Sequence, residues 1–124
     1  MAHRLVVTTA MAFLATACGS DNGMGPSPPV AGSTITITSS GVSPKSLLVS
    51  PATQVTFMNS DSRNHQMTSD PHPEHSDCPA INTVDLVVPG QSKQTSNLNA
   101  VRTCGYHDHQ NPENAALRGT ITIQ

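Results

Sequence analysis

The stretch Gly119-Thr120-Ile121-Thr122-Ile123 near the end of the chain alternates apolar and polar side chains. Thr34-Ile35-Thr36-Ile37-Thr38 and Gln54-Val55-Thr56-Phe57-Met58-Asn59 show the same alternation. Successive side chains of a β-strand point to opposite faces, so this period of two predicts strands with one buried face. We expect Val55 and Phe57 to point into the core.

Further short strands are predicted between these stretches, with turns rich in proline and glycine between them. The expected strands cover residues 42–49, 65–68, 84–88, 93–98 and 101–105. Strong helix formers are sparse after the N-terminal segment. Several short strands at regular spacing predict an all-β domain of the β-sandwich class.

The composition limits the classes of function. The 124 residues suffice for one domain, and only 11% of them are charged, with a formal net charge of −2. No basic patch favours nucleic-acid binding. No Ser-His-Asp ordering or paired carboxylate set supports catalysis, and a domain this small offers little room for a substrate pocket. We therefore expect neither an enzyme nor a nucleic-acid-binding protein, and we expect a monomer.

The first residues are typical of a targeting segment. Residues 1–17 combine a short, weakly basic start with an apolar stretch that is too short to span a bilayer. The segment runs into Leu14-Ala15-Thr16-Ala17-Cys18, which resembles a bacterial lipobox, although Ala15 stands where such boxes usually carry leucine. We expect residues 1–17 to be a signal peptide and Cys18 to be lipidated. Cleaved secretion without a lipid is the alternative.

The remaining chain is expected to lie outside the cytoplasm. Residues 18–32 begin with Cys18 and continue as a Gly/Pro/Ser-rich flexible linker, and residues 33–124 form the folded domain. A lipid would anchor this domain to the cell envelope, on the periplasmic side of a bacterial membrane or at the cell surface. Disulfides can persist in such compartments.

The run Cys104-Gly105-Tyr106-His107-Asp108-His109 carries the clearest chemical signal. A thiolate and an imidazole three positions apart can bind a metal, and His65 follows an earlier strand-like run. One cysteine and two histidines form the ligand set of a mononuclear copper electron-transfer site. We expect Tyr106 to serve packing rather than chemistry.

The order of motifs resembles the cupredoxin family, in its plastocyanin-like and amicyanin-like bacterial branch. The resemblance covers roughly residues 33–124 and rests on these motifs: Val42-x-Pro44, Leu47-x-Val49, Gln54–Asn59, His65, Pro89-Gly90-Gln91-Ser92, Cys104-x-x-His107 and Gly119–Ile123. It implies a Greek-key β-sandwich with one copper ion, cycling between Cu+ and Cu2+, at one end. It also implies that His65, Cys104 and His107 bind the copper and that the protein exchanges single electrons with a redox partner protein.

The axial position departs from the family pattern, because no methionine follows Cys104. Counting back from the last strand places Leu117 there as a non-coordinating occupant, which would raise the reduction potential. His109 is the second choice, since its ring could swing to the metal. Gln110 is the third, and an oxygen ligand there would lower the potential.

The polar loop between residues 69 and 82 leaves an alternative open. His72 and His75 are either incidental or part of a second metal site or copper-acquisition surface. If Cys18 is lipidated, Cys78 and Cys104 remain as a possible disulfide, which would remove the thiolate ligand. The protein would then be a copper-handling module that sequesters or delivers the ion, with a copper donor or acceptor as partner. Its histidine-only site would draw on His65, His72, His75, His107 and His109.

Overall fold

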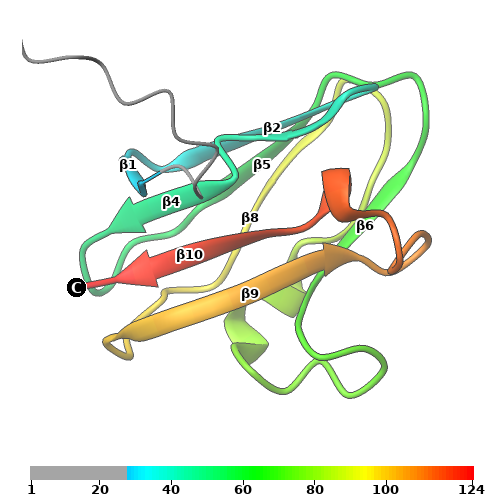
Figure 1. Cartoon of the computed structure of the whole chain (residues 1–124). Coiled ribbons are helices and arrows are strands. Elements are labelled where there is room, and N and C mark those ends of the chain that lie inside the picture. Colours follow the sequence, from blue (N-terminus) through cyan, green and yellow to red (C-terminus); the bar gives the residue numbers. More distant parts are fainter. Residues whose placement is uncertain (1–27) are drawn as a thin grey trace, which may run out of the picture.

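The computed structural model describes residues 28–124, which form two packed β-sheets (Figure 1). One sheet has the strand order β1 (Val30–Ala31), β4 (Ser46–Val49), β10 (Gly119–Ile123), β9 (Arg102–Asp108), β6 (His65–Ser69) and β7 (Asp85–Val87). The other has the order β3 (Gly41–Ser43), β2 (Thr34–Thr38), β5 (Thr56–Asn59) and β8 (Ser92–Gln94). The predicted all-β sandwich is confirmed.

The alternating stretches form strands with one buried face, as predicted. In β2, Ile35 and Ile37 are fully buried, and in β10 Ile121 and Ile123 are buried in the same way. β2 runs parallel to β5, while β10 runs parallel to β4 and antiparallel to β9. The isoleucines of the two sheets therefore face one another across a common core.

Two short 3-10 helices complete the described fold. η1 (Pro79–Thr83) follows the long polar loop, and its Ile81 is fully buried. η2 (Ala115–Leu117) precedes β10, and the Asn114 side chain accepts a hydrogen bond from Ala116 N at 3.0 Å. η1 lies against β6, and η2 lies against β3.

The sheet begins earlier than the expected domain boundary at residue 33. β1 lies inside the segment that we predicted as linker, where Val30 and Ala31 pair with Leu47 and Leu48 of β4. The expected signal peptide and Cys18 lie outside the described residues. Within residues 28–124, no helix has the length and apolar character needed to cross a membrane.

Tyr106 and Phe57 provide the aromatic centre of the core. Both side chains are fully buried, and their rings meet edge to face with centroids 5.2 Å apart. The Tyr106 hydroxyl has no hydrogen-bond partner among the described residues. Burial therefore raises the pKa of Tyr106 above its ordinary value. The predicted packing role of Tyr106 agrees with this position.

Replacing Tyr106 with phenylalanine is expected to leave the free energy of unfolding unchanged or to raise it. The substitution removes a buried hydroxyl that makes no hydrogen bond, while the ring contact with Phe57 remains. Urea unfolding of the two proteins checks this expectation, and Phe57→Leu provides the control because it removes the ring contact. A loss of more than about 1 kcal/mol in the Tyr106→Phe variant would mean that the hydroxyl is hydrogen-bonded in solution.

Candidate metal centre

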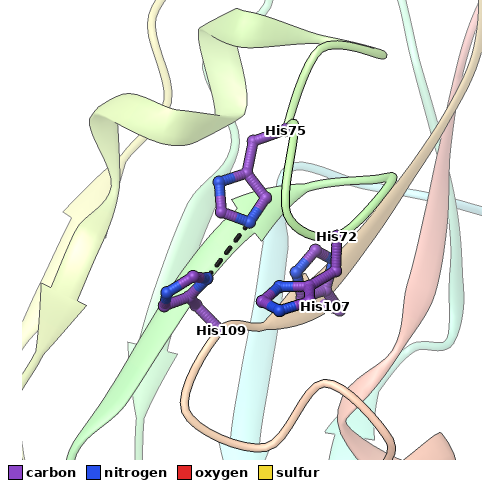
Figure 2. A group of neighbouring side chains, drawn as sticks. All are labelled: His72, His75, His107 and His109. Atoms are coloured by element: carbon purple, nitrogen blue, oxygen red, sulfur yellow. Dashed lines mark hydrogen bonds between the residues drawn. The ribbon is translucent and has the colours of Figure 1, made fainter.

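Four histidines converge where the loop after β6 crosses the end of β9 (Figure 2). His107 lies in β9 and His109 just beyond it, while His72 and His75 lie in the loop. One nitrogen from each ring lies within 4.8 Å of the others. His107 is buried, His75 and His109 are half-buried and His72 is exposed, so the cluster sits at the surface.

The spacing of two of the rings fits a single ion. His109 Nδ1 and His75 Nε2 are 3.1 Å apart and point toward each other. Two imidazole nitrogens bound to one ion at about 2.0–2.1 Å lie about 2.9–3.4 Å apart for cis or tetrahedral geometry. The observed separation falls in this range, so one ion can replace the contact between these two rings without moving them far.

Asp70 orients the buried ring of His107, a candidate ligand. The carboxylate lies 2.6 Å from His107 Nδ1, which therefore donates its proton to Asp70 Oδ1. The lone pair is then left on Nε2, which lies 3.3 Å from the hydroxyl of Thr68. A carboxylate that fixes the tautomer and direction of a histidine is a common support for a metal ligand.

The contact between Asp70 and His107 depends on the absence of a side chain at Gly105. A Cβ atom at this position would overlap the Asp70 carboxylate. The backbone also joins the two residues, because Asp70 N donates to Gly105 O at 3.0 Å. Gly105, which is only a spacer in the Cys-x-x-His motif, is thus part of the support for His107.

The histidine loop is fastened to β9 on its far side as well. A disulfide joins Cys78 to Cys104, whose Cα atoms are 5.8 Å apart. Next to it, the Asp77 carboxylate accepts from Gly105 N at 3.1 Å and pairs with Arg102. Together with the contacts of Asp70, these contacts hold the loop against the strand at both ends of the segment that carries His72 and His75.

The side chain of Asn82 fixes the conformation of the loop through two hydrogen bonds. Its side-chain oxygen accepts from Ser69 N at 2.8 Å, and its side-chain amide donates to His75 O at 2.8 Å. His75 itself adopts a φ of 52°, in the left-handed region that residues other than glycine rarely occupy. The fold therefore imposes an unfavourable backbone conformation at the residue that turns its ring toward His109.

Partial burial lowers the pKa of His75 below its ordinary value, and charge repulsion from His109, His107 and His72 lowers it further. A neutral imidazole is the form that binds a metal ion. His75 is therefore held in its metal-binding form to a lower pH than an exposed histidine would be.

The same shift predicts acid sensitivity of the metal-free protein. In the unfolded chain His75 takes up a proton near pH 6.5, whereas in the folded protein it does so only at lower pH. The free energy of unfolding therefore falls as the pH drops below about 6.5. Urea unfolding between pH 7.5 and 5.5 measures the effect. The His75→Gln variant should lose part of this pH dependence, and an unchanged dependence would contradict the assignment to His75.

The structure does not bring together His65, Cys104 and His107, the ligand set that the sequence suggested. β9 continues to Asp108, beyond its predicted end at residue 105, so Cys104 and His107 lie in one extended strand. Residues three apart in a strand point to opposite faces. Cys104 points into the core and forms the disulfide, the alternative that the sequence left open, while His107 faces the loop.

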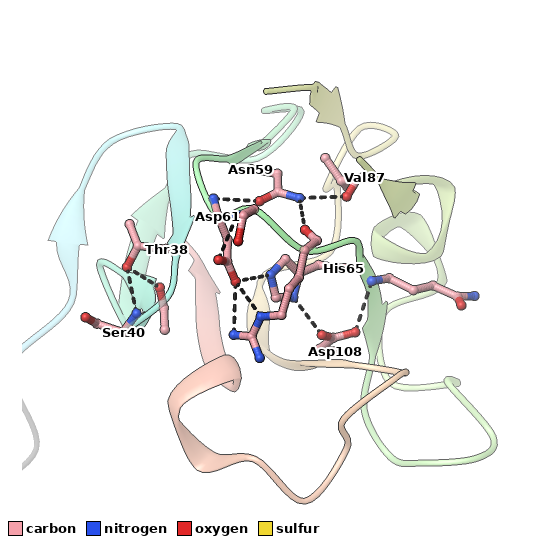
Figure 3. Close-up of polar contacts among 11 residues, drawn as sticks. Thr38, Ser40, Asn59, Asp61, His65, Val87 and Asp108 are labelled. Carbon is pink, nitrogen blue, oxygen red and sulfur yellow. Dashed lines mark hydrogen bonds and ion pairs between the residues drawn. The ribbon is translucent and has the colours of Figure 1, made fainter. Parts of the chain in front are cut away.

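His65 belongs to a different polar network on the inner side of the sheet (Figure 3). Its Nδ1 lies 2.8 Å from Asp108 Oδ2 and its Nε2 lies 3.0 Å from Asp61 Oδ2. Each ring nitrogen of His65 thus faces a carboxylate oxygen at hydrogen-bond distance. Neither nitrogen is then free to bind a metal. The three side chains are at most 3% exposed.

Both carboxylates of this network accept further hydrogen bonds. Burial opposes the ionisation of Asp61, but hydrogen bonds from His65, Ser62 and Arg63 outweigh it and lower the pKa of Asp61. Asp108 also accepts from Gln66 N and Gln110 N, each at 3.0 Å. The network thereby fixes the backbone between His107 and His109.

The other axial candidates lie in different surroundings. Leu117 is buried in the core with an exposure of 1%, and Gln110 is exposed. His109 joins the histidine cluster, and its backbone N–H donates to Gln66 O at 2.7 Å. Three residues that support the site could not be found from the periodicity or spacing of the sequence: Thr68, Asp70 and Asp108.

Comparisons with known proteins bear on the fold. No family model and no curated protein matches this sequence. A structure described as a novel purple cupredoxin from Nitrosopumilus maritimus matches with a TM-score of 0.56 at 16% identity, over 75% of this chain and 100% of that one. The fold is cupredoxin-like.

Two other solved structures agree with this cupredoxin-like fold. Plastocyanin from Dryopteris crassirhizoma matches with a TM-score of 0.56 at 16% identity, over 73% of this chain and 99% of its own. An oxidised amicyanin mutant matches with a TM-score of 0.57 at 16% identity, over 73% of this chain and 80% of its own. Identities this low relate the folds, and the metal chemistry has to be argued from the site itself.

Proposed function

We propose that this protein binds one copper ion through His72, His75, His107 and His109 and acts as an extracytoplasmic copper-handling module. The observation that carries the proposal is the convergence of four imidazole nitrogens within 4.8 Å, two from the loop after β6 and two from the end of β9, to which a disulfide crosslinks the loop. Imidazole binds copper well, and copper(II) forms the most stable complexes in the divalent first-row series. One of the amicyanin structures with a similar fold is described in its Cu(I) form, which supports copper as the first metal to test.

The disulfide favours a histidine-only centre. The sulfur of Cys104 is bonded to Cys78 and is fully buried, so it offers no thiolate. A centre made of His65, Cys104 and His107 would require reduction of this bond. It would also require His65 to leave Asp61 and Asp108. The four-histidine centre requires neither change.

A copper titration of the folded domain tests the proposal. We expect one equivalent of Cu(II) to bind, with an electron paramagnetic resonance spectrum that shows nitrogen ligands and with no intense thiolate charge-transfer band. A thiol assay of the denatured, unreduced domain should find neither Cys78 nor Cys104 free. An intense thiolate band, or two free thiols, would overturn the histidine-only centre.

Zinc provides a matched control for the same site. Four imidazoles also suit Zn(II), which has no charge-transfer bands and no unpaired electron. We expect Zn(II) to compete with Cu(II) for one site, with Cu(II) binding more tightly, as the general order of metal affinities requires. Simultaneous binding of both ions with full occupancy would show that the histidines do not form one centre.

One-electron transfer to a redox partner protein is the second candidate function. Electron transfer is favoured by the positions of the ligand residues, which lie on a strand and on a loop that a disulfide joins to that strand. A fixed ligand set limits rearrangement when copper changes its oxidation state. Cyclic voltammetry separates the two functions, because a carrier keeps the ion and gives a reversible wave. Release of Cu(I) on reduction would favour copper delivery.

We also propose that a lipid on Cys18 anchors the domain to the cell envelope. The lipobox-like sequence that ends at Cys18 supports this proposal, as does the disulfide, which requires an oxidising compartment. The Cys18→Ser variant is expected to move from the membrane fraction to the soluble fraction of cells. If the unmodified protein is already soluble after fractionation, cleaved secretion replaces lipidation as the explanation.

A further inference from the structure

A hollow of about 320 Å³ opens beside two of the four histidines. It borders the exposed ring of His72 and the buried ring of His107, and it does not border His75 or His109. An ion held by the four rings would therefore face this hollow on one side only. The hollow is lined by Asp70, Pro71, His72, His107, Pro112, Glu113 and Arg118.

The charged groups around the hollow differ in whether they already have an ion-pair partner. Asp70 is committed to His107, which it contacts at 2.6 Å. Glu113 and Arg118 are both exposed, and neither side chain has an ion-pair partner among residues 28–124. The Arg118 guanidinium is thus the one unpaired cation that borders the hollow in the described part of the chain.

The backbone of Arg118 is fixed even though its side chain is free. Its carbonyl oxygen accepts from Lys45 Nζ at 3.2 Å, and its N–H donates to Ala115 O at 3.4 Å as the C-cap of η2. The next residue begins β10. Arg118 is therefore presented at the rim of the hollow by a well-held segment, and its five donors can turn toward a ligand there.

We propose that this hollow binds a small inorganic anion, which contacts the metal on the side of His72 and His107 and pairs with Arg118. The inference rests on the proposed metal centre. A divalent ion among neutral imidazoles keeps its charge, and Asp70 offsets only part of it, so an anion is the favoured additional ligand. The hollow has room for a few heavy atoms with their water, at about 30 Å³ for each water molecule.

Azide is a suitable probe, because its binding to Cu(II) produces a charge-transfer band. The Cu(II)-loaded protein is titrated with azide, and the same titration is followed by calorimetry with the Zn(II)-loaded protein. We expect a single azide site, and we expect Arg118→Gln to weaken azide binding about two- to tenfold at low ionic strength. Arg118→Lys should retain part of the affinity, since it keeps the charge but not the planar fork.

Glu113→Gln is the matched control of opposite sign. It removes a negative charge from the same rim and should tighten azide binding, about two- to fivefold. Both effects should shrink at high salt, because the groups are exposed. Equal azide affinity in the unmodified, Arg118→Gln and Glu113→Gln proteins would overturn the anion site.

The two proposals fail in distinguishable ways. Resonance spectra recorded before azide is added report whether Cu(II) occupies the histidine centre in each variant. Normal copper spectra without azide binding would refute the anion site and leave the copper centre standing. Absence of bound copper in the unmodified protein would refute the proposed function itself.

Discussion

Replacing Cys78 and Cys104 together with serine is expected to lower the free energy of unfolding by about 3–4 kcal/mol. The two cysteines are 26 positions apart, and opening this loop raises the conformational entropy of the unfolded chain. The variant should also bind Cu(II) about 10- to 100-fold more weakly, because the loop with His72 and His75 is no longer fastened to β9. Urea unfolding and copper competition titrations measure the two losses.

Metal-saturated unfolding tells whether the two losses have the same origin. If the variant is merely less stable, copper should bind the fraction that is folded with unchanged affinity. If the crosslink preorganises the loop, affinity falls even where the variant is fully folded. Unchanged copper affinity in the folded variant would contradict the preorganising role. A separate experiment uses the unmodified protein with both cysteines reduced. An intense thiolate band in that protein would indicate that Cys104 can serve as a ligand.

Replacing His109 with alanine is expected to reduce Cu(II) affinity more than about 100-fold, since it removes one of four ligands. The change should cost little stability, because His109 is half-buried and its ring packs against two other histidines of the cluster, His72 and His75. Competition with a copper chelator of known affinity measures the loss. The result separates two ligand sets, since a centre of His65, Cys104 and His107 keeps all three of these ligands in this variant.

His65→Gln provides the complementary control. Glutamine can donate to Asp108 or to Asp61 but not replace both bonds, so a loss of stability is expected. Copper affinity and the nitrogen hyperfine pattern of the folded fraction should remain those of the unmodified protein. If copper binding is lost with His65→Gln and kept with His109→Ala, the histidine cluster is not the copper centre.

The strands were predictable because their signal is local. Alternation in Thr34–Thr38, Gln54–Asn59 and Gly119–Ile123 reports which face each side chain takes, and burial in the structure follows it. The boundaries were less predictable. Val30 and Ala31 become a strand by pairing with β4, a contact with residues distant in the sequence.

The candidate site was predictable in its residue types and only partly in its membership. The Cys-x-x-His spacing brings two ligands together on a loop but separates them on a strand. Gly105 and Tyr106 gave no sign that β9 would continue to Asp108. The choice between the two arrangements depends on the pairing of β9 with β6, where Met67 faces Asp108 and Thr68 faces His107, and sequence spacing does not report such pairing.

If the protein binds its metal and is exported as proposed, the crosslink between the histidine loop and β9 also makes metal binding depend on when the disulfide forms. While the chain is still in a reducing compartment, the bond between Cys78 and Cys104 cannot persist, and two of the four histidines are not fastened beside the other two. Oxidation after export would complete the cluster. We therefore expect the protein to acquire its metal only at its destination, so that it would not withdraw copper from the cytoplasm during synthesis.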